Sequence, residues 1–273
     1  MGKLFKRLMG VMVGVSVVIL SGCSTWTNLK EEKVQERGGS VDKVKQQQCI
    51  KDQLEKKYGE AFELISIDSR TDVMNPGTIL AICYPVQDKT IKFTARLDVE
   101  TGELRDKYLC ELVGRNEEPM ITEYVKTLWE ACKVYVYNDT GIVSPTETNR
   151  EMRHKEFLKL YPGSWQKVII YIQGPSSGSE IDQEKEIEKY KLLATWLADN
   201  EYFKTSVSIF YLMPKAYEIY DEVRDKEYYA AAYYRENKEE SIYANIGVRV
   251  NADGTLDESD EDFKENFAVW IKE

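Results

Sequence analysis

The sequence has one histidine and few prolines or glycines. Its 273 residues include 1 His, 7 Pro and 16 Gly. A single histidine disfavours metal centres built on imidazole and hydrolases built on a Ser-His pair, because both need histidine at a defined place. The low proline and glycine content excludes collagen-like and low-complexity chains. With 42% hydrophobic residues, a chain of this length can form a sizeable core. We therefore expect a globular fold without a metal or a cofactor.

Positive charge is also scarce. The chain has 37 basic and 47 acidic residues, a net charge of −10. Proteins that bind nucleic acids displace phosphate counterions with clustered Lys and Arg, so we expect no nucleic-acid partner. The mean hydropathy of −0.48 excludes a membrane protein with many spans.

The one long apolar run lies at the N-terminus. Lys3, Lys6 and Arg7 precede an apolar stretch at 8–20, which is shorter than the roughly 20 residues of a spanning helix. A basic region followed by a short apolar region is typical of a secretion signal. We therefore expect residues 1–22 to be a targeting segment that is removed from the mature chain.

A cysteine motif ends this segment. Residues 20–23 are Leu-Ser-Gly-Cys, an aliphatic residue and two small residues before cysteine. The motif resembles the lipobox of bacterial lipoproteins. The resemblance implies that Cys23 receives a diacylglycerol thioether and holds the mature chain on the outer face of the bacterial cell membrane, since two or more acyl chains anchor a protein stably. An uncleaved anchor and an ordinary secretion signal are the alternatives.

The region after Cys23 is polar. Removal of the leader, which has three basic residues and no acids, leaves 34 basic and 47 acidic residues, a net charge of −13. Residues 23–40 contain few apolar side chains and include Gly38-Gly39-Ser40, a composition typical of flexible linkers. We expect a charged tether here, with the start of the following helix as the alternative for its second half.

Hydrophobic periodicity predicts two folded units, which a polar segment around Ser144-Pro145 separates. In the first unit, residues 41–143, the pattern favours a helix, three strands, a helix and a strand, at 41–58, 62–67, 78–86, 90–99, 120–131 and 133–137. In the second unit, residues 144–273, it favours helices and strands at 148–161, 167–173, 179–200, 205–213, 217–236, 241–250 and 262–272. The predicted class is α+β, with helices packed on small, mainly antiparallel sheets in two similar-sized units.

A similar turn closes a strand in each unit. Residues 99–104 and 251–256 both place a glycine after a strand, and shared hairpin chemistry explains this as well as duplication does. The Tyr58-Gly59 helix end and the turn at 99–104 resemble the helix-plus-antiparallel-sheet units of PepSY-type extracytoplasmic domains. This resemblance concerns the fold, and it implies modulation of a neighbouring protease as an alternative function.

One serine motif suggests catalysis. Residues 174–178, Gly-Pro-Ser-Ser-Gly, lie between a predicted strand and a predicted helix, as a nucleophile elbow does. In that fold the base follows the serine along the chain, but the single histidine, His154, precedes Ser176. We therefore expect a helix-capping connection and a solvated His154, assign no catalytic residue, and lean against an enzyme. A cell-surface hydrolase that uses Ser176 or two carboxylates is the alternative.

The cysteines and the C-terminal acids raise two further alternatives. Cys49, Cys83, Cys110 and Cys132 fit two disulfides, with three pairings open, and fit four thiols equally well. Their spacing is not that of a zinc site. The acidic run at 257–262 suggests calcium, but Arg249 would occupy the first ligand position of the loop, so we expect no metal.

Tyrosine is abundant near the C-terminus. Exposed tyrosines often recognise sugars, peptides or proteins, because they join a rigid apolar ring to a polar hydroxyl. A place in the core is the alternative for these residues. The predicted binding surface contains Tyr217, Tyr220, Tyr228, Tyr229, Tyr233 and Tyr234. The sequence thus favours a lipid-anchored binding protein whose partner is a cell-wall polymer, a peptide or a membrane protein.

Overall fold

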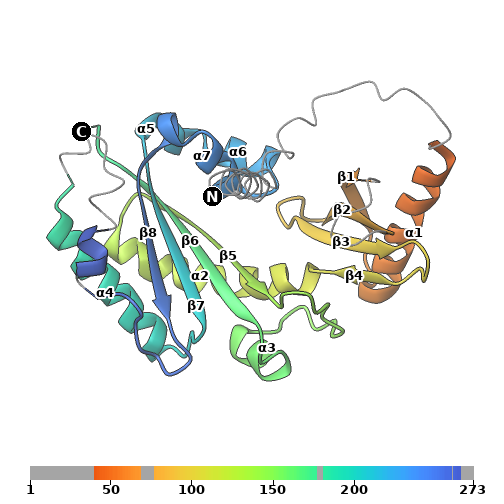
Figure 1. Ribbon diagram of the computed structural model, residues 1–273, viewed down its shortest axis with the longest axis horizontal. Helices are drawn as coiled ribbons and strands as arrows, with labels where there is room; N and C mark the ends of the chain where they lie inside the picture. The colour runs from red at the N-terminus through yellow and green to blue at the C-terminus, as the bar shows by residue number, and fades with distance from the viewer. Residues whose placement is uncertain (1–39, 69–76, 177–180, 260, 266–273) are drawn as a thin grey trace, which may run out of the picture. The chain divides into compact units, whose positions relative to one another are not determined.

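The computed structural model describes residues 40–68, 77–176, 181–259 and 261–265 (Figure 1). Residues Lys43–Glu273 form one compact unit, which contains two four-stranded sheets with helices packed on them. Five of the six strand pairings in the described residues are antiparallel, and one is parallel. The predicted α+β class with two similar-sized units is confirmed. The leader at 1–22 and Cys23 lie outside the described residues.

The first sheet is an antiparallel meander with one helix against it. Its strands are β1 (Phe62–Asp68), β2 (Thr78–Pro85), β3 (Phe93–Asp98) and β4 (Leu104–Asp106), in the order β1-β2-β3-β4. Helix α1 (Ser40–Tyr58) contributes Ile50 and Leu54 to the core of this sheet. The helix ends at Gly59, whose φ of 71° is a left-handed conformation that glycine adopts without a Cβ penalty. The predicted helix at 41–58 is confirmed.

Helix α2 contributes side chains to the hydrophobic cores of both sheets. It runs from Tyr108 to Leu128, so the predicted helix at 120–131 begins too late. Its first turns carry polar residues that bind within the protein, such as Glu111 and Glu117, and this hides the apolar periodicity. The first half places Tyr108 in the core of the first sheet, and the second half places Ile121 in the core of the second sheet.

The second sheet has the order β5-β6-β7-β8. Its strands are β5 (Cys132–Asp139), β6 (Trp165–Gln173), β7 (Thr205–Leu212) and β8 (Ile242–Val250). Helix α4 (Gln183–Asp199) connects β6 to β7, which allows these two strands to be parallel. Helices α2 and α4 pack on one face of the sheet. The sheet thus begins at Cys132, before the predicted division at 143/144.

Two predicted helices of the second unit are shorter than expected. Residues 148–161 form only α3 (His154–Leu160). The preceding Arg153 is extended and forms an ion pair with Glu117 of α2. The predicted helix at 217–236 consists of α5 (Pro214–Glu218), α6 (Tyr220–Lys226) and α7 (Ala230–Glu236), followed by α8 (Lys238–Ser241). Of the predicted final helix, 262–265 are helical, and 266–272 lie outside the described residues.

Contacts with Lys92, which directly precedes β3, accompany the break between α6 and α7. Lys92 Nζ donates hydrogen bonds to the carbonyl oxygens of Arg224, Asp225 and Glu227 at 2.8, 2.9 and 2.6 Å. These carbonyls lie at the C-terminal end of α6, where a cation stabilises the helix. Tyr229 then has extended backbone angles and precedes α7.

Candidate functional site

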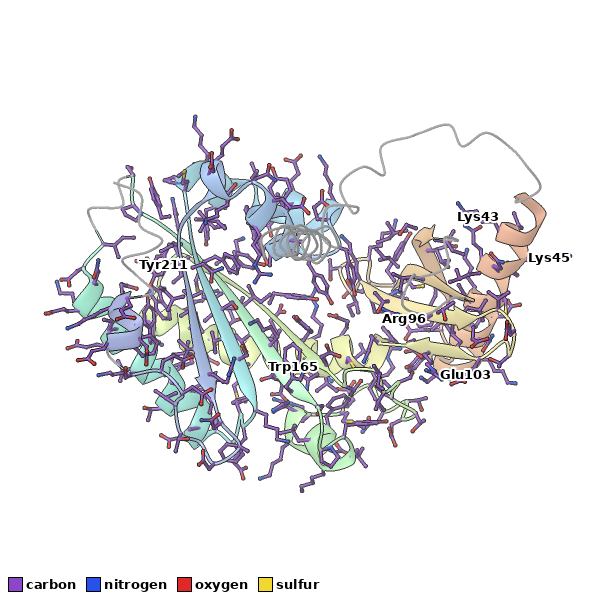
Figure 2. All side chains as sticks on the ribbon, viewed as in Figure 1. Lys43, Lys45, Arg96, Glu103, Trp165 and Tyr211 are labelled. Atoms are coloured by element: carbon purple, nitrogen blue, oxygen red, sulfur yellow. The ribbon has the colours of Figure 1, made fainter. Side chains whose placement is uncertain are left out.

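Helices cover the two faces of the second sheet unequally. On the face opposite α2 and α4, a second apolar cluster joins Tyr171, Phe210 and Leu212 to residues of α5, α6 and α7, which lie at one end of the strands (Figure 1). Trp165 lies toward the other end of the strands and Tyr211 toward the helix-covered end (Figure 2). Gly247 is exposed, and a Cβ built on it would meet no atom within 4 Å. This end of the face is therefore open.

Side chains of four strands lie in a row at the open end. In the strand register, Lys167 of β6 is opposite Tyr137 of β5 and Ser206 of β7, and Ser206 is opposite Arg249 of β8. Neighbouring strands are about 4.8 Å apart, so the row is about 15 Å wide. Residues opposite one another share a face, so these four side chains lie together.

A pocket of about 470 Å³ opens on this row. We call it the basic pocket. Its lining consists of Gly163, Ser164, Trp165, Lys167, Lys204, Thr205, Ser206, Arg249, Val250, Asn251 and Ala252. The lining thus contains three cations, one tryptophan and no acidic residue, although acids exceed bases in the chain as a whole. Such a lining favours an anion.

Lys167 is the central cation of the basic pocket. Its ammonium donates a hydrogen bond to Ser206 Oγ at 3.0 Å, and no carboxylate of the described residues forms an ion pair with it. Burial, together with the nearby guanidinium groups of Arg235 and Arg249, lowers the pKa of Lys167 to about 8. The folded protein therefore holds a desolvated ammonium near other positive charges.

Lys204 and Trp165 form one side of the basic pocket. Lys204 has a φ of 56°, which costs a residue with a Cβ about 1–2 kcal/mol. Its carbonyl oxygen accepts a hydrogen bond from Gln166 N at 2.9 Å, which joins the loop to β6. The Trp165 ring is half-buried, and its centroid is 6.0 Å from that of Tyr137. Arg249, in contrast, already pairs with Asp257 at 3.0 Å.

Two of the predicted binding tyrosines form a cluster around a buried carboxyl group. Tyr135 Oη donates to Glu111 Oε2 at 2.6 Å, and Tyr229 Oη donates to Glu111 Oε1 at 3.4 Å. Tyr228 Oη donates to Tyr229 Oη at 3.1 Å. Burial raises the pKa of Glu111 to about 8, against the lowering effect of the Tyr135 hydrogen bond and of Arg115. The carboxyl group is thus mainly protonated at neutral pH. We call these four residues, Glu111, Tyr135, Tyr228 and Tyr229, the tyrosine cluster.

The other four predicted tyrosines belong to the apolar cluster beneath α5–α7. Tyr220 and Tyr234 are buried, with exposed fractions of 3% and 0%, and Tyr234 Oη donates to the carbonyl oxygen of Ala216. Tyr217 and Tyr233 are half-buried at the margin. The alternative that these tyrosines lie in the core is therefore right for Tyr220 and Tyr234. Sequence reasoning missed Tyr137, Trp165, Lys167 and Arg249, although a lysine beside the apolar run at 168–172 was a usable signal.

His154 is buried, and the expectation that it is solvated is wrong. Its exposed fraction is 1%. Nε2 lies 3.0 Å from the carbonyl oxygen of Phe203 and therefore donates to it, so Nδ1 accepts a hydrogen bond from Asn138 Nδ2 at 2.9 Å. Burial lowers the pKa of His154. This neutral imidazole has both nitrogens occupied and stabilises the packing of α3 on the sheet.

Ser176 and His154 lie at opposite ends of β6. His154 bonds to Asn138, which pairs with Gln166 near the start of β6, whereas Ser176 follows the strand end at Gln173. Seven residue steps along a strand span about 23 Å. Gly174 has a packing role, because a Cβ there would lie 2.8 Å from the carbonyl oxygen of Leu212.

The four cysteines at 49–132 are free thiols. The thiol alternative is therefore right and the disulfide alternative is wrong. Burial raises the pKa values of Cys83 and Cys110 to about 12. Thiols with such pKa values contain almost no thiolate at neutral pH and react slowly.

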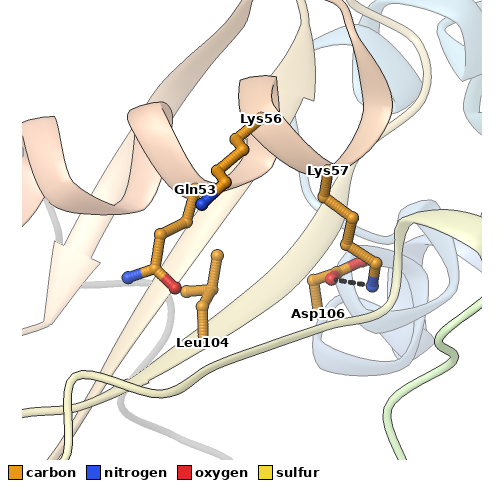
Figure 3. A pocket seen from close by; sticks show the side chains of 5 residues that line it. All are labelled: Gln53, Lys56, Lys57, Leu104 and Asp106. Carbon is orange, nitrogen blue, oxygen red and sulfur yellow. Dashed lines mark hydrogen bonds and ion pairs between the residues drawn. The ribbon is translucent and has the colours of Figure 1, made fainter.

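A second pocket lies between α1 and β4 (Figure 3). It has a volume of about 460 Å³ and is lined by Gln53, Lys56, Lys57, Leu104 and Asp106. Lys57 Nζ is 2.7 Å from Asp106 Oδ2 and donates to the carbonyl oxygen of Pro145. Because Asp106 already neutralises the Lys57 ammonium, the second pocket is less favourable for binding an anion than the basic pocket is.

Two general site types are absent from the described residues. None of the helices that these residues form combines the length and apolar character needed to cross a bilayer. No three His, Cys, Asp or Glu side chains within 40–68, 77–176, 181–259 and 261–265 gather into a group that could hold a metal ion.

Comparison with known proteins identifies a fold but no function. No protein-family model matches the chain, and no curated protein matches it. A crystal structure of a DUF5037 family protein from Ruminococcus gnavus ATCC 29149 is similar, with a TM-score of 0.54 and 19% sequence identity over 81% of this chain and 98% of that chain. At this identity the likeness concerns the fold alone. Lipid anchoring at Cys23 and the resemblance to PepSY-type domains stay predictions.

Proposed function

We propose that this chain is a lipid-anchored extracytoplasmic binding protein that presents the basic pocket to a cell-wall polymer. The observation that carries the proposal is the open end of the second sheet, where Tyr137, Trp165 and Lys167 lie together. The predicted tether would let this surface reach a ligand away from the lipid anchor.

The energetics of the basic pocket favour a ligand. A desolvated ammonium without a carboxylate destabilises the folded chain, and Lys167 has no such partner among the described residues. Lys204 adds backbone strain at the same pocket, and strained residues often lie at functional sites. A bound ligand with complementary charge would offset these costs.

The chemistry of the site favours binding over catalysis. His154 and Ser176 do not line the basic pocket, and they do not approach each other. The buried Glu111 and the half-buried Glu118 line neither of the two pockets. Asp106, which lines the second pocket, is already paired with Lys57. The alternative of a hydrolase that uses two carboxylates therefore gains no support from the site geometry.

Metabolic labelling tests the anchor. Cells that express the full chain should incorporate labelled palmitate into it, and Cys23→Ser should abolish incorporation, because the thioether needs the thiol. Ser24→Ala is the matched control and should retain the label. Incorporation that persists in Cys23→Ser would overturn lipid anchoring at this residue.

Sedimentation with deproteinised cell wall tests the binding role. The full chain in detergent should bind saturably, and Trp165→Ala should weaken binding at least tenfold because it removes an aromatic wall of the basic pocket. Trp196→Ala is the control, since Trp196 stacks on Tyr124 at a ring distance of 4.5 Å and does not line the basic pocket. An absence of saturable binding, or equal losses in both variants, would refute the proposal.

A further inference from the structure

We infer that the basic pocket binds a saccharide that carries a carboxylate or phosphate group, with the anionic group at Lys167 and Lys204 and the sugar ring against Trp165. This inference deepens the proposed function and rests on it. It specifies the chemical class of ligand, and each part of that class follows from a different feature of the pocket.

The charge of the lining indicates an anion. Lys167, Lys204 and Arg249 line the pocket together with eight uncharged residues. Arg249 is paired with Asp257, which lies outside the lining. Within the described residues, the Lys167 ammonium donates a hydrogen bond only to Ser206 Oγ, and the Lys204 ammonium donates only to the carbonyl oxygen of Pro162. Two ammonium groups therefore remain without a counter-charge among the described residues, and an anionic ligand can supply it.

A hydroxyl group beside Lys167 adds a donor. Ser206 Oγ accepts the hydrogen bond from Lys167 Nζ, and its own proton has no acceptor among the described residues. The other lining hydroxyls are used within the protein, since Ser164 donates to the carbonyl oxygen of Tyr161 and Thr205 donates to Gln166 Oε1. An oxygen of a carboxylate or phosphate would accept from both Lys167 and Ser206.

The size and the aromatic wall of the pocket indicate a ring. Its volume of about 470 Å³ lies in the range of sites for organic ligands and far exceeds the needs of an inorganic ion. Trp165 is half-buried, so part of its indole is free of protein contacts. Indole and phenol rings present a flat apolar surface next to polar groups, which complements the C–H face and the hydroxyl groups of a pyranose.

The net charge of the whole chain favours one of two possible sources of the anionic group. Sugars of the cell wall and lipid headgroups both carry such groups. The mature chain has a predicted net charge of −13, so an anionic membrane surface repels it as a whole. A polymer segment can enter the pocket alone and meet only its local positive charge. We therefore assign the pocket to a wall saccharide.

Matched pairs of probes test the inference on the full chain in detergent. The first pair is a hyaluronan tetrasaccharide and its carboxyl-reduced form, and the second is glucose 6-phosphate and glucose. In calorimetric titrations at pH 7, the charged member of at least one pair should bind at least tenfold more tightly than its neutral partner. Lys167→Gln should remove this preference, and Lys204→Gln should reduce it. Lys56→Gln, in the second pocket, should leave it unchanged.

The pH dependence gives an independent signature. Because Lys167 loses its proton near pH 8 in the free protein, affinity for the charged probe should fall as the pH rises above about 8, by up to tenfold per unit. The neutral probe should show no such fall. Tyr137 of β5, Arg235 of α7 and Arg249 of β8 also face this region, and their charges are constant between pH 7 and 9 because the pKa of Tyr137 is raised to about 12 and guanidinium groups stay protonated.

Each contrary result has a distinct meaning. Equal binding of charged and neutral probes, or an unchanged preference in Lys167→Gln, would overturn the anionic class. Inorganic phosphate that binds as tightly as the sugars would overturn the role of the ring. Binding to phosphatidylglycerol vesicles but to neither charged sugar would assign the pocket to a membrane instead. If cell-wall binding remains sensitive to Trp165→Ala in these cases, the proposed function stands without the inference; if wall binding is absent as well, both fail.

Discussion

The two ends of one sheet face differ in what covers them. At one end, Tyr171 and Phe210 lie beneath α5–α7, with exposed fractions of 1% and 0%. At the other end, Lys167 and Ser206 lie on the same strands but line a pocket. Strand alternation places all four side chains on one face. The comparison shows that the covering helices, rather than the sheet, separate core from binding surface.

Truncation of a covered tyrosine should have the largest effect. Tyr234→Ala removes a ring with 0% exposure and its hydrogen bond to Ala216, so the free energy of unfolding should fall by about 3–5 kcal/mol. Tyr137→Ala, at the open end, should cost about 1 kcal/mol because its ring is only half-buried. Urea unfolding of both variants measures the difference. Equal losses would show that the two ends are packed alike.

The tyrosine cluster between the two ends should make stability depend on pH. The pKa of Glu111 is raised to about 8 in the folded chain, so the folded state holds this proton at pH values where the unfolded state has lost it. Its contribution to the free energy of unfolding, about 5 kcal/mol, is present below about pH 4.5 and is lost as the pH rises toward 8. Glu111→Gln, which stays neutral, should remove this part of the slope.

Unfolding experiments between pH 5 and 8 measure that slope. Glu123→Gln serves as the control, because Glu123 is an exposed acid of the same helix and should leave the pH dependence unchanged. A wild-type slope that Glu111→Gln does not alter would show that the carboxyl group titrates normally.

At the open end of the sheet face, the free energy of unfolding should depend on pH with the opposite sign. The pKa of Lys167 is lowered to about 8, so the unfolded state binds the extra proton between pH 8 and 10.5 and stability from this group rises with pH there. Lys167→Met should therefore stabilise the free protein by about 1 kcal/mol at pH 7, and this gain should vanish above pH 10.5. Lys56→Met is the exposed control. A destabilised Lys167→Met would mean that Lys167 supports the fold and is not held for a ligand.

Quenching of the Trp165 fluorescence at the open end should give the smallest of these effects. Iodide, an anion, should quench Trp165 more strongly than caesium does, because cations line the pocket beside this ring. The comparison uses wild type and Trp165→Phe, whose difference isolates Trp165 among the five tryptophans. Equal quenching by both ions would argue against a positive potential at the pocket.

The sequence predicted the strands better than the site. Apolar runs such as 168–172 and 207–212 mark buried strands directly, because period and length alone identify them. The strand predicted at 133–137 lies within β5, but the sheet that it joins depends on long-range pairing with β6. The first half of α2 was missed because Glu111 and Glu117 are satisfied by residues far along the chain, Tyr135 and Arg153.

The basic pocket could not be predicted for the same reason. Trp165 and Lys167 are neighbours in sequence, but Tyr137, Ser206 and Arg249 join them only through strand register. His154 illustrates the converse error, since a charged local sequence suggested exposure while Asn138 and Phe203 bury it. Local sequence thus reports the type of an element, and the partners of a polar side chain are decided by topology.

Helix α2 constrains the order in which the chain can fold. The first sheet is complete once Asp106 has joined β4 and Tyr108 has packed on it. The second half of the same helix carries Ile121 and Val125, which find their partners only when β6, β7 and β8 are available. Because α2 ends at Leu128 and β8 ends only at Val250, the apolar face of this helix lacks its full cover until late in the chain. Exposed apolar surface favours aggregation, so the partly folded chain is most prone to aggregate before this last strand is in place.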